Sequence, residues 1–312
     1  MKLMNTMNLP FLTTARTAMR SFAVAVMVLS GVSIAQAQPR QPVPAEVPDV
    51  VRMARPTEAE LDTARASLAA FLRSADAQTR SILDRFPGVL EVRDLPANTA
   101  IIPNLAQGFR EKHERNLEVA GQGNAELLLM GDSITDFWRN PEGNFAGKPV
   151  LDEYFGQWNI ANFGIAGDTT EGVLYRLENG EGDGFSPRAI MLMIGTNNTR
   201  RNSAGEISEG VGAIVLSLRE HFPDAEILLL GIFPRSQPDN PVREQIAEIN
   251  RTISRLDDGE TVHYMDIGDV FLDADGTIPT SVMTDGLHPT TEGYRRWAEA
   301  VREPLTALMG GE

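Results

Sequence analysis

The chain has 312 residues, of which 42% are hydrophobic and 23% are charged, so it can bury a sizeable core and is not disordered overall. Its acidic residues outnumber its basic ones to give a net charge of −15, and no sustained Lys/Arg run is present, which argues against a nucleic-acid partner. The absence of cysteine excludes disulfides and thiolate nucleophiles, so covalent chemistry falls to Ser, Thr, Asp, Glu or Lys.

Residues 1–37 have the pattern of a signal peptide. Basic residues precede a mostly apolar run over 22–34, and the run is followed by Ala35-Gln36-Ala37, an A-x-A cleavage site. We expect cleavage after Ala37, export to the periplasm or the extracellular space, and no stable membrane association afterwards. The alternative is an uncleaved membrane anchor, but the run is shorter than the roughly 20 residues that span a bilayer.

Two segments follow before the main domain. Residues 38–56 are rich in proline, which fixes φ and removes backbone donors, so we expect an extended linker. Residues 57–98 are expected to form a helical extension, with Thr57 as N-cap and Glu60 completing a capping box. A second short helix is predicted over 77–86. Neither segment has a predicted function.

Helices and strands alternate in the remainder of the chain, residues 99–312. One amphipathic helix is expected over about 102–120. Apolar residues at helical spacing also predict helices between the later strands, and the last helix is expected to kink at Pro304. Short apolar runs predict five buried strands, over 126–130, 159–163, 189–194, 226–230 and 262–267. This order indicates an α/β fold with a parallel sheet, helices on both faces, and functional loops at the carboxyl ends of the strands.

The first strand leads directly into Gly131-Asp132-Ser133, ahead of a predicted helix. At this position a serine hydroxyl can project from the edge of the sheet, and helix-terminal amides can face a developing anion. Ser133 is therefore a candidate nucleophile. The alternative is that it serves only as a helix N-cap.

Two further turns lie at carboxyl ends of strands. One contains Gly167, where the absence of a side chain lets a backbone N–H approach a substrate. The other contains Asn197, whose amide is a neutral donor that does not titrate. Together they could form an oxyanion hole, although Gly and Asn are also common in turns that have no catalytic role.

The turn after the last strand carries Asp285 and His288. A serine nucleophile needs a neutral imidazole as base and a carboxylate that orients the ring. The other histidines, His113, His221 and His263, fall in predicted helices or a strand, so only His288 is predicted at the catalytic edge. No metal site is predicted, because HExxH is absent and the acidic stretch after residue 272 lacks the remaining positions of a calcium loop.

The blocks GDSITDFW, NFGIAGDTT, IGTNN and TDGLHP resemble, in this order, the four blocks of the SGNH (GDSL-like) hydrolase family, over about residues 99–309. The longer stretches NFGIAGDTTEGVLYRLENGE and LLLGIFPR are most similar to the branch of platelet-activating-factor acetylhydrolases and secreted bacterial esterases. The resemblance implies a three-layer α/β/α flavodoxin-like domain that needs no cofactor. It also implies a triad of Ser133, His288 and Asp285, and an oxyanion hole formed by the N–H groups of Ser133 and Gly167 and the side-chain amide of Asn197.

We therefore expect a serine ester hydrolase that works through an acyl-enzyme and removes acetyl or other short acyl groups from carbohydrates or small esters. A lysophospholipase or short-chain lipase is one alternative, and a noncatalytic carbohydrate-binding or surface protein is another. The loop 180–184 is small and acidic, which makes it a poor apolar lid, and the negative net charge favours neutral sugars over anionic membranes. The natural substrate and the oligomeric state are not predicted.

Overall fold

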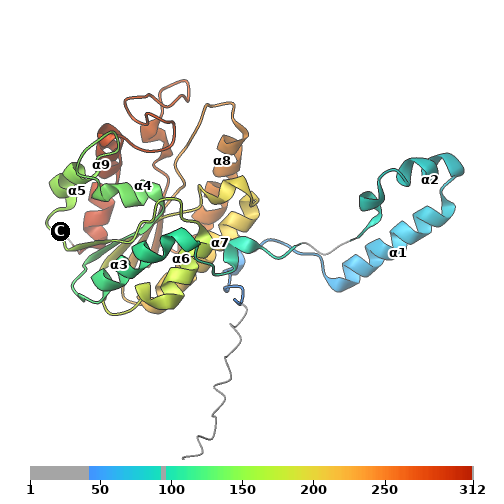
Figure 1. Cartoon of the computed structure of the whole chain (residues 1–312), viewed down its shortest axis with the longest axis horizontal. Coiled ribbons are helices and arrows are strands. Elements are labelled where there is room, and N and C mark those ends of the chain that lie inside the picture. Colours follow the sequence, from blue (N-terminus) through green and yellow to red (C-terminus); the bar gives the residue numbers. More distant parts are fainter. Residues whose placement is uncertain (1–41, 93–95, 311–312) are drawn as a thin grey trace, which may run out of the picture. The chain divides into compact units, whose positions relative to one another are not determined.

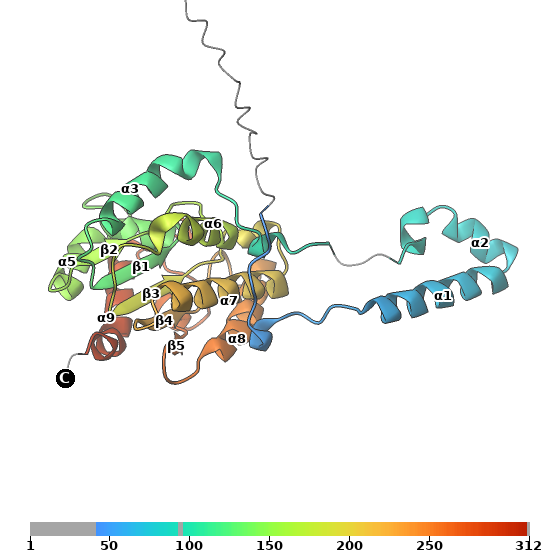
Figure 2. The ribbon, with the colours of Figure 1, turned by 90° about the horizontal axis from the view of Figure 1, so that it is seen from below.

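One sheet of five short parallel strands lies between helices (Figure 1), and its strands follow the order β2-β1-β3-β4-β5 (Figure 2). A computed structural model describes residues 42–92 and 96–310, so the predicted signal peptide lies outside the described residues. The strands are β1 (Leu127–Gly131), β2 (Ile160–Asn162), β3 (Ala189–Met193), β4 (Glu226–Leu230) and β5 (Val262–Met265). The prediction of five strands is confirmed, with differences at the strand ends. The strands β1, β3 and β4 are buried, whereas three of the four residues of the edge strand β5 are only partly buried.

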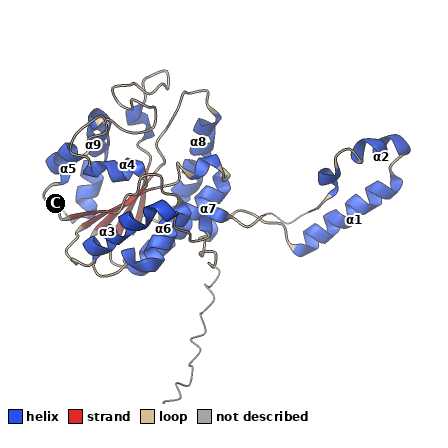
Figure 3. Ribbon diagram, viewed as in Figure 1, coloured by secondary structure: helices blue, strands red, loops and turns tan. Residues whose placement is uncertain are grey.

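The helices of the described chain alternate with the strands from β1 onward (Figure 3). They are α1 (Glu58–Ser74), α2 (Ala77–Leu83), α3 (Arg110–Ala120), α4 (Ser133–Asp136), α5 (Lys148–Phe155), α6 (Thr170–Arg176), α7 (Ala204–His221), α8 (Pro241–Ile253) and α9 (Thr291–Leu308). The helix α3 starts later than the sequence suggests. Residues 103–106 are not helical, Asn104 donates its N–H to the Glu171 carbonyl, and a short 3-10 helix over Gln107–Phe109 comes directly before α3. None of the helices in the described ranges is long and apolar enough to cross a membrane.

Apolar side chains cover both faces of the sheet. Leu128 and Met130 of β1 face a core shared with α6, α7 and α8. Leu127 and Leu129 of the same strand face the opposite core, which includes residues of α5 and α9. Because neighbouring residues of a strand point to opposite faces, burial on both sides requires the continuous apolar runs seen in the sequence. The predicted α/β fold with helices on both faces is confirmed (Figure 2).

The segment before α1 is more ordered than a free linker would be. Val47 and Val51 are buried, and a Cβ added to Gly212 of α7 would contact Val51 and Pro48. Residues 47–51 of the segment predicted as a linker therefore pack on the helical layer. Further along, Thr57 and Glu60 form the predicted capping box at the start of α1.

Parallel strands bring several loops to one edge of the sheet. The tight turn after β1 requires glycine at Gly131, because a Cβ there would collide with Thr135 and the Met193 carbonyl. The Asp132 carboxylate caps α4 by accepting a hydrogen bond from the Ile134 N–H at 3.0 Å. Ser133 is thereby held at the first position of α4, directly beyond the end of β1.

Candidate active site

Ser133, His288 and Asp285 form one hydrogen-bonded chain. Ser133 Oγ lies 2.9 Å from His288 Nε2, and His288 Nδ1 lies 2.6 Å from Asp285 Oδ2. Asp285 accepts a hydrogen bond from Nδ1–H, and Nε2 is then free to accept a proton from the serine hydroxyl. Local sequence cannot fix this arrangement, because Ser133 and His288 are 155 residues apart.

The loop backbone fixes the position of the Asp285 carboxylate. Its Oδ1 accepts hydrogen bonds from the backbone N–H groups of Leu287 at 3.0 Å and His288 at 2.8 Å. Partial burial raises the pKa of Asp285, but the hydrogen bonds from the His288 side chain and backbone outweigh it and hold this pKa below its usual value. The carboxylate is therefore ionised at neutral pH and can stabilise a protonated His288 ring.

The other three histidines are engaged elsewhere. His113 is buried on α3 and its Nδ1 lies 2.8 Å from Glu181 Oε1. His263 on β5 pairs with Glu226, and the His221 ring lies near Asp183. Only His288 among the four histidines, all of which are in the described ranges, approaches Ser133.

The loops that carry Gly167 and Asn197 lie side by side next to Ser133. Gly167 has φ +90°, a left-handed conformation that favours glycine. The Asn197 Nδ2 donates to the Asp168 carbonyl at 2.8 Å, which ties the two loops together. Within residues 42–92 and 96–310, the N–H groups of Ser133 and Gly167 donate no hydrogen bond. Two backbone donors and one amide are thus available near the serine hydroxyl.

A buried ion cluster of Arg176, Asp168 and Glu181 packs behind the Gly167 loop. Arg176 on α6 is fully buried, and it binds Asp168 Oδ2 through Nε at 3.0 Å and through a second nitrogen at 2.8 Å. The same guanidinium also pairs with Glu181, which in turn accepts from Asn116 at 3.1 Å and lies within hydrogen-bond distance of His113. The cluster fixes Asp168, whose carbonyl holds the Asn197 amide.

The loop 180–184 does not border the substrate site, contrary to the expectation from its composition. Glu181 has no exposed surface and belongs to the buried cluster, and none of the five loop residues lines the pocket at Ser133. Its small, acidic composition therefore carries no information about the acyl group of the substrate.

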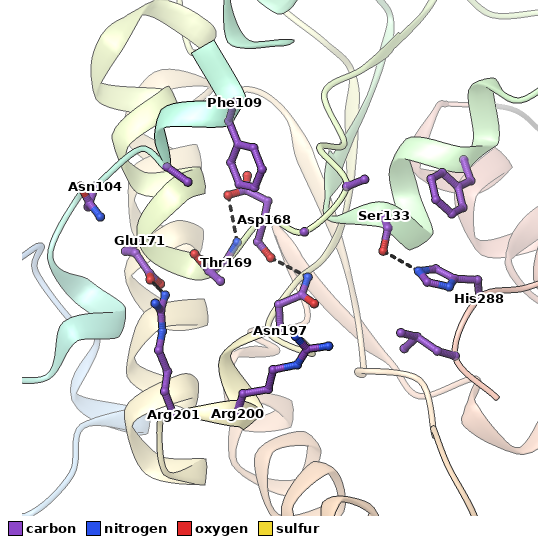
Figure 4. A pocket seen from close by; sticks show the side chains of 15 residues that line it. Asn104, Phe109, Ser133, Asp168, Thr169, Glu171, Asn197, Arg200, Arg201 and His288 are labelled. Carbon is purple, nitrogen blue, oxygen red and sulfur yellow. Dashed lines mark hydrogen bonds and ion pairs between the residues drawn. The ribbon is translucent and has the colours of Figure 1, made fainter. Parts of the chain in front are cut away.

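Ser133, His288 and the loops with Gly167 and Asn197 line a pocket of about 640 Å³ (Figure 4). Ser133 and His288 lie on one side of it, and Asp168 and Asn197 lie on another; Gly167 also lines the pocket. The remaining lining comes from Asn104, Ala106, Phe109, Phe137, Ala166, Thr169, Glu171, Arg200, Arg201 and Leu287. Polar and apolar groups both reach the cavity, as is common for small-molecule sites.

Aromatic residues after the nucleophile divide between the site and the core. Phe137 lines the pocket, with its ring centroid 5.1 Å from that of His288, and Phe145 packs on both rings. Trp138 is instead fully buried against Tyr294 and Trp297. Phe137 is therefore the aromatic side chain of this stretch that a substrate could contact.

Asp132, next to the nucleophile, is almost completely buried. Burial raises its pKa to about 7, although the hydrogen bond from the Ile134 N–H opposes the shift. Its Oδ2 has no hydrogen-bond partner in the described structure. This carboxyl group is thus partly protonated at neutral pH.

The pocket contains residues that were not predicted from the sequence. Arg200 and Arg201 follow the GTNN block after Thr199, and their position beyond the carboxyl end of β3 in a chain poor in basic residues was a usable signal. Glu171 and Phe109 gave no such signal, because their approach to the pocket depends on how α6 and the segment before α3 pack. No cluster of three or more His, Asp or Glu side chains suited to a metal ion is found in the described part of the chain.

Comparisons with known proteins agree with this geometry. Residues 129–296, which include all five predicted site residues, match the GDSL-like lipase/acylhydrolase family. Platelet-activating factor acetylhydrolase IB subunit alpha2 of Rattus norvegicus is 32% identical over 220 residues, covering 68% of this chain and 93% of the relative. Subunit alpha1 of Bos taurus is 32% identical over 198 residues, covering 63% and 82%.

The fold also matches a solved structure. A protein from Streptococcus pneumonia, described as a platelet activating factor, superposes with a TM-score of 0.54 at 22% sequence identity, covering 74% of this chain and 100% of that one. At this level of identity the likeness concerns the fold alone.

Proposed function

The chain belongs to the GDSL-like lipase/acylhydrolase family and hydrolyses esters, and from this premise we propose that it removes acetyl or other short acyl groups from carbohydrates or small esters. The observation that carries the proposal is the hydrogen-bonded chain from Ser133 through His288 to Asp285, which opens into the pocket.

In the proposed mechanism, Ser133 Oγ attacks the ester carbonyl while His288 Nε2 takes the hydroxyl proton. Asp285 orients the ring and stabilises its positive charge. The negative charge on the carbonyl oxygen is stabilised by the N–H groups of Ser133 and Gly167 and the second N–H of the Asn197 amide. The tetrahedral intermediate then expels the alcohol, which receives the proton from His288. Water attacks the resulting acyl-enzyme in a second, equivalent step that releases the acid.

A short acyl group is supported by the curated relatives, which are acetylhydrolases by name. The large apolar side chains of the pocket are Phe109, Phe137 and Leu287, beside the small Ala106 and Ala166. Each methylene that such a surface buries contributes about 0.8 kcal/mol, so a lipase groove would make kcat/KM rise steadily with chain length. Polar side chains such as Asn104 and Thr169 at the same pocket suit a hydroxylated alcohol.

A panel of substrates tests this proposal. We expect p-nitrophenyl acetate to be hydrolysed best among the esters from acetate to palmitate, with activity falling beyond about butyrate, and acetylated xylan to be deacetylated. Ser133→Ala should lose activity on the order of 10⁴-fold or more while its unfolding curve stays that of the wild type. Efficiency that climbs through octanoate and decanoate, together with hydrolysis of lysophospholipid, would replace the proposal with a lipase.

Export is a separate proposal, supported by the charged, apolar and A-x-A segments of residues 1–37. Mass spectrometry of the protein recovered from the periplasm or medium of an expressing bacterium should show a chain that begins at Gln38. A full-length chain retained with the cells would contradict it.

A further inference from the structure

The charged side chains of the pocket are unevenly neutralised. Glu171 is almost fully buried, and it binds Arg201 and accepts a hydrogen bond from Asn198 at 2.9 Å. Asp168 is held by Arg176 in the buried cluster. Each carboxylate of the pocket is therefore already paired with an arginine of the protein, without a bound substrate.

Arg200 is different from its neighbour Arg201. Its side chain is exposed at the pocket, and Figure 4 shows it reaching toward Asn197 rather than toward Glu171. Among the described residues it has no ion-pair or hydrogen-bond partner for its guanidinium. An uncompensated positive charge therefore lies beside the proposed oxyanion hole.

A second arginine strengthens the positive field at this place. Arg235, in the loop after β4, donates to the carbonyl and hydroxyl oxygens of Thr196 at 3.3 Å, and its Nε is buried without a partner. Partial burial lowers the pKa of Arg235, repulsion from the nearby charge of Arg200 lowers it further, and the Asp132 carboxylate opposes the shift. An anion bound near Arg200 would relieve this repulsion.

We propose that Arg200 binds an anionic group on the alcohol part of the ester and makes the enzyme selective for acylated molecules that carry a carboxylate or phosphate. The proposal rests on the proposed function, because an acetyl group carries no charge and the anion must then belong to the alcohol. It changes the preferred substrate from the neutral sugars that the net charge suggested to acidic ones. The planar guanidinium can hold either anion through two parallel hydrogen bonds.

The net charge of −15 does not contradict this selectivity. Salt screens charges over about 8 Å at physiological ionic strength, so carboxylates on distant surfaces act weakly at the pocket. Arg200 would contact the anion directly and is screened less. The local charge of the pocket therefore decides which substrate binds.

Matched pairs of acetate esters test the proposal. One pair is acetylated methyl glucoside and acetylated methyl glucuronide, and the other is 1-acetylglycerol and its 3-phosphate. We expect the wild type to have the higher kcat/KM for the anionic member of at least one pair. Arg200→Gln should lower the anionic-to-neutral ratio by about five- to tenfold, and Arg200→Lys should retain part of it. The pair that responds identifies carboxylate or phosphate as the group bound.

Arg302→Gln is the matched control, because Arg302 is an exposed arginine of α9 outside the pocket and the change in net charge is the same. Its ratio should remain that of the wild type. Equal ratios in the wild type and Arg200→Gln, or an equal fall in Arg302→Gln, would overturn the proposal.

The two proposals fail in different ways. If p-nitrophenyl acetate and every acetate ester resist the wild type, the proposed function fails. Arg200 is then tested by calorimetric binding of methyl glucuronide and glycerol 3-phosphate to Ser133→Ala. Binding that is lost when Arg200→Gln is added supports the anion site, and binding that is absent or unchanged contradicts it.

Discussion

Replacing Arg176 by methionine should show how much the buried ion cluster contributes to the free energy of unfolding. The guanidinium is fully buried and holds Asp168 through two contacts of 2.8 and 3.0 Å, as well as Glu181. Methionine fills much of the same volume without a charge. The substitution leaves the Asp168 and Glu181 carboxylates buried without their cation. The free energy of unfolding then depends on the hydrogen bonds that each carboxylate still accepts.

The two carboxylates are not affected equally. Glu181 keeps the donors His113 and Asn116, whereas the Asp168 side chain keeps only the hydrogen bond from the Thr169 N–H. Breaking a buried pair by removing one partner typically costs 3–5 kcal/mol, and we expect the free energy of unfolding to fall by about that amount at pH 7. This is a large share of the roughly 5–15 kcal/mol that stabilises a typical domain.

The loss should also depend on pH. Burial raises the pKa of Asp168 even with Arg176 opposing the shift, so removing Arg176 raises this pKa further. The folded variant then holds a proton that the unfolded chain releases, and its stability increases as the pH falls. The difference in the free energy of unfolding between Arg176→Met and the wild type should therefore be smaller at pH 5 than at pH 7.

Urea unfolding followed by the fluorescence of the buried Trp138 and Trp297 measures both effects. Lys148→Met is the control, since it breaks an exposed ion pair with Asp152 and should cost less than about 1 kcal/mol. A loss no larger than that of the control, or one that is the same at both pH values, would refute the reasoning. The folded fraction of Arg176→Met should also have a lower kcat, because Asp168 positions Asn197.

Three further predictions concern the site itself. Asn197→Ala should lower kcat by about 10²- to 10³-fold with a smaller change in KM, and a change confined to KM would make Asn197 a substrate-binding residue. Asp285→Asn should lower kcat by about 10⁴-fold because the ring is then held in the wrong tautomer, and a loss below tenfold would argue against the triad. Asp132→Asn should be more stable than the wild type at pH 8, by up to about 4 kcal/mol. The pKa of Asp132 is about 7 in the folded state and about 4 in the unfolded state, so the free energy of unfolding of the wild type falls as the pH rises between these two values. Denaturation at pH 8 and pH 5 measures this difference, and equal gaps at the two pH values would contradict it.

The architecture and the site loops were predictable because their signals are local. Strands buried on both faces must be continuously apolar, so the runs at 126–130 and 226–230 predicted β1 and β4 almost to the residue. Parallel strands all end at one edge of the sheet, and this rule alone predicts that Ser133, Gly167 and Asn197 lie together. The same rule brings the turn with Asp285 and His288 to that edge.

Tertiary packing decided what lies around those residues. Nothing in the sequence distinguishes Arg200 from Arg201, and only the position of the buried Glu171 leaves one paired and the other free at the pocket. The loop around Glu181 has the composition of an exposed acidic turn, yet Glu181 is buried because it forms an ion pair with the buried Arg176. Charged side chains carry no periodic signal of burial, because the partner that permits it is supplied by another element of the fold. For this protein, therefore, the sequence by itself determined the α/β fold and which loops meet at the site, and the tertiary structure alone determined which charges in that site are neutralised.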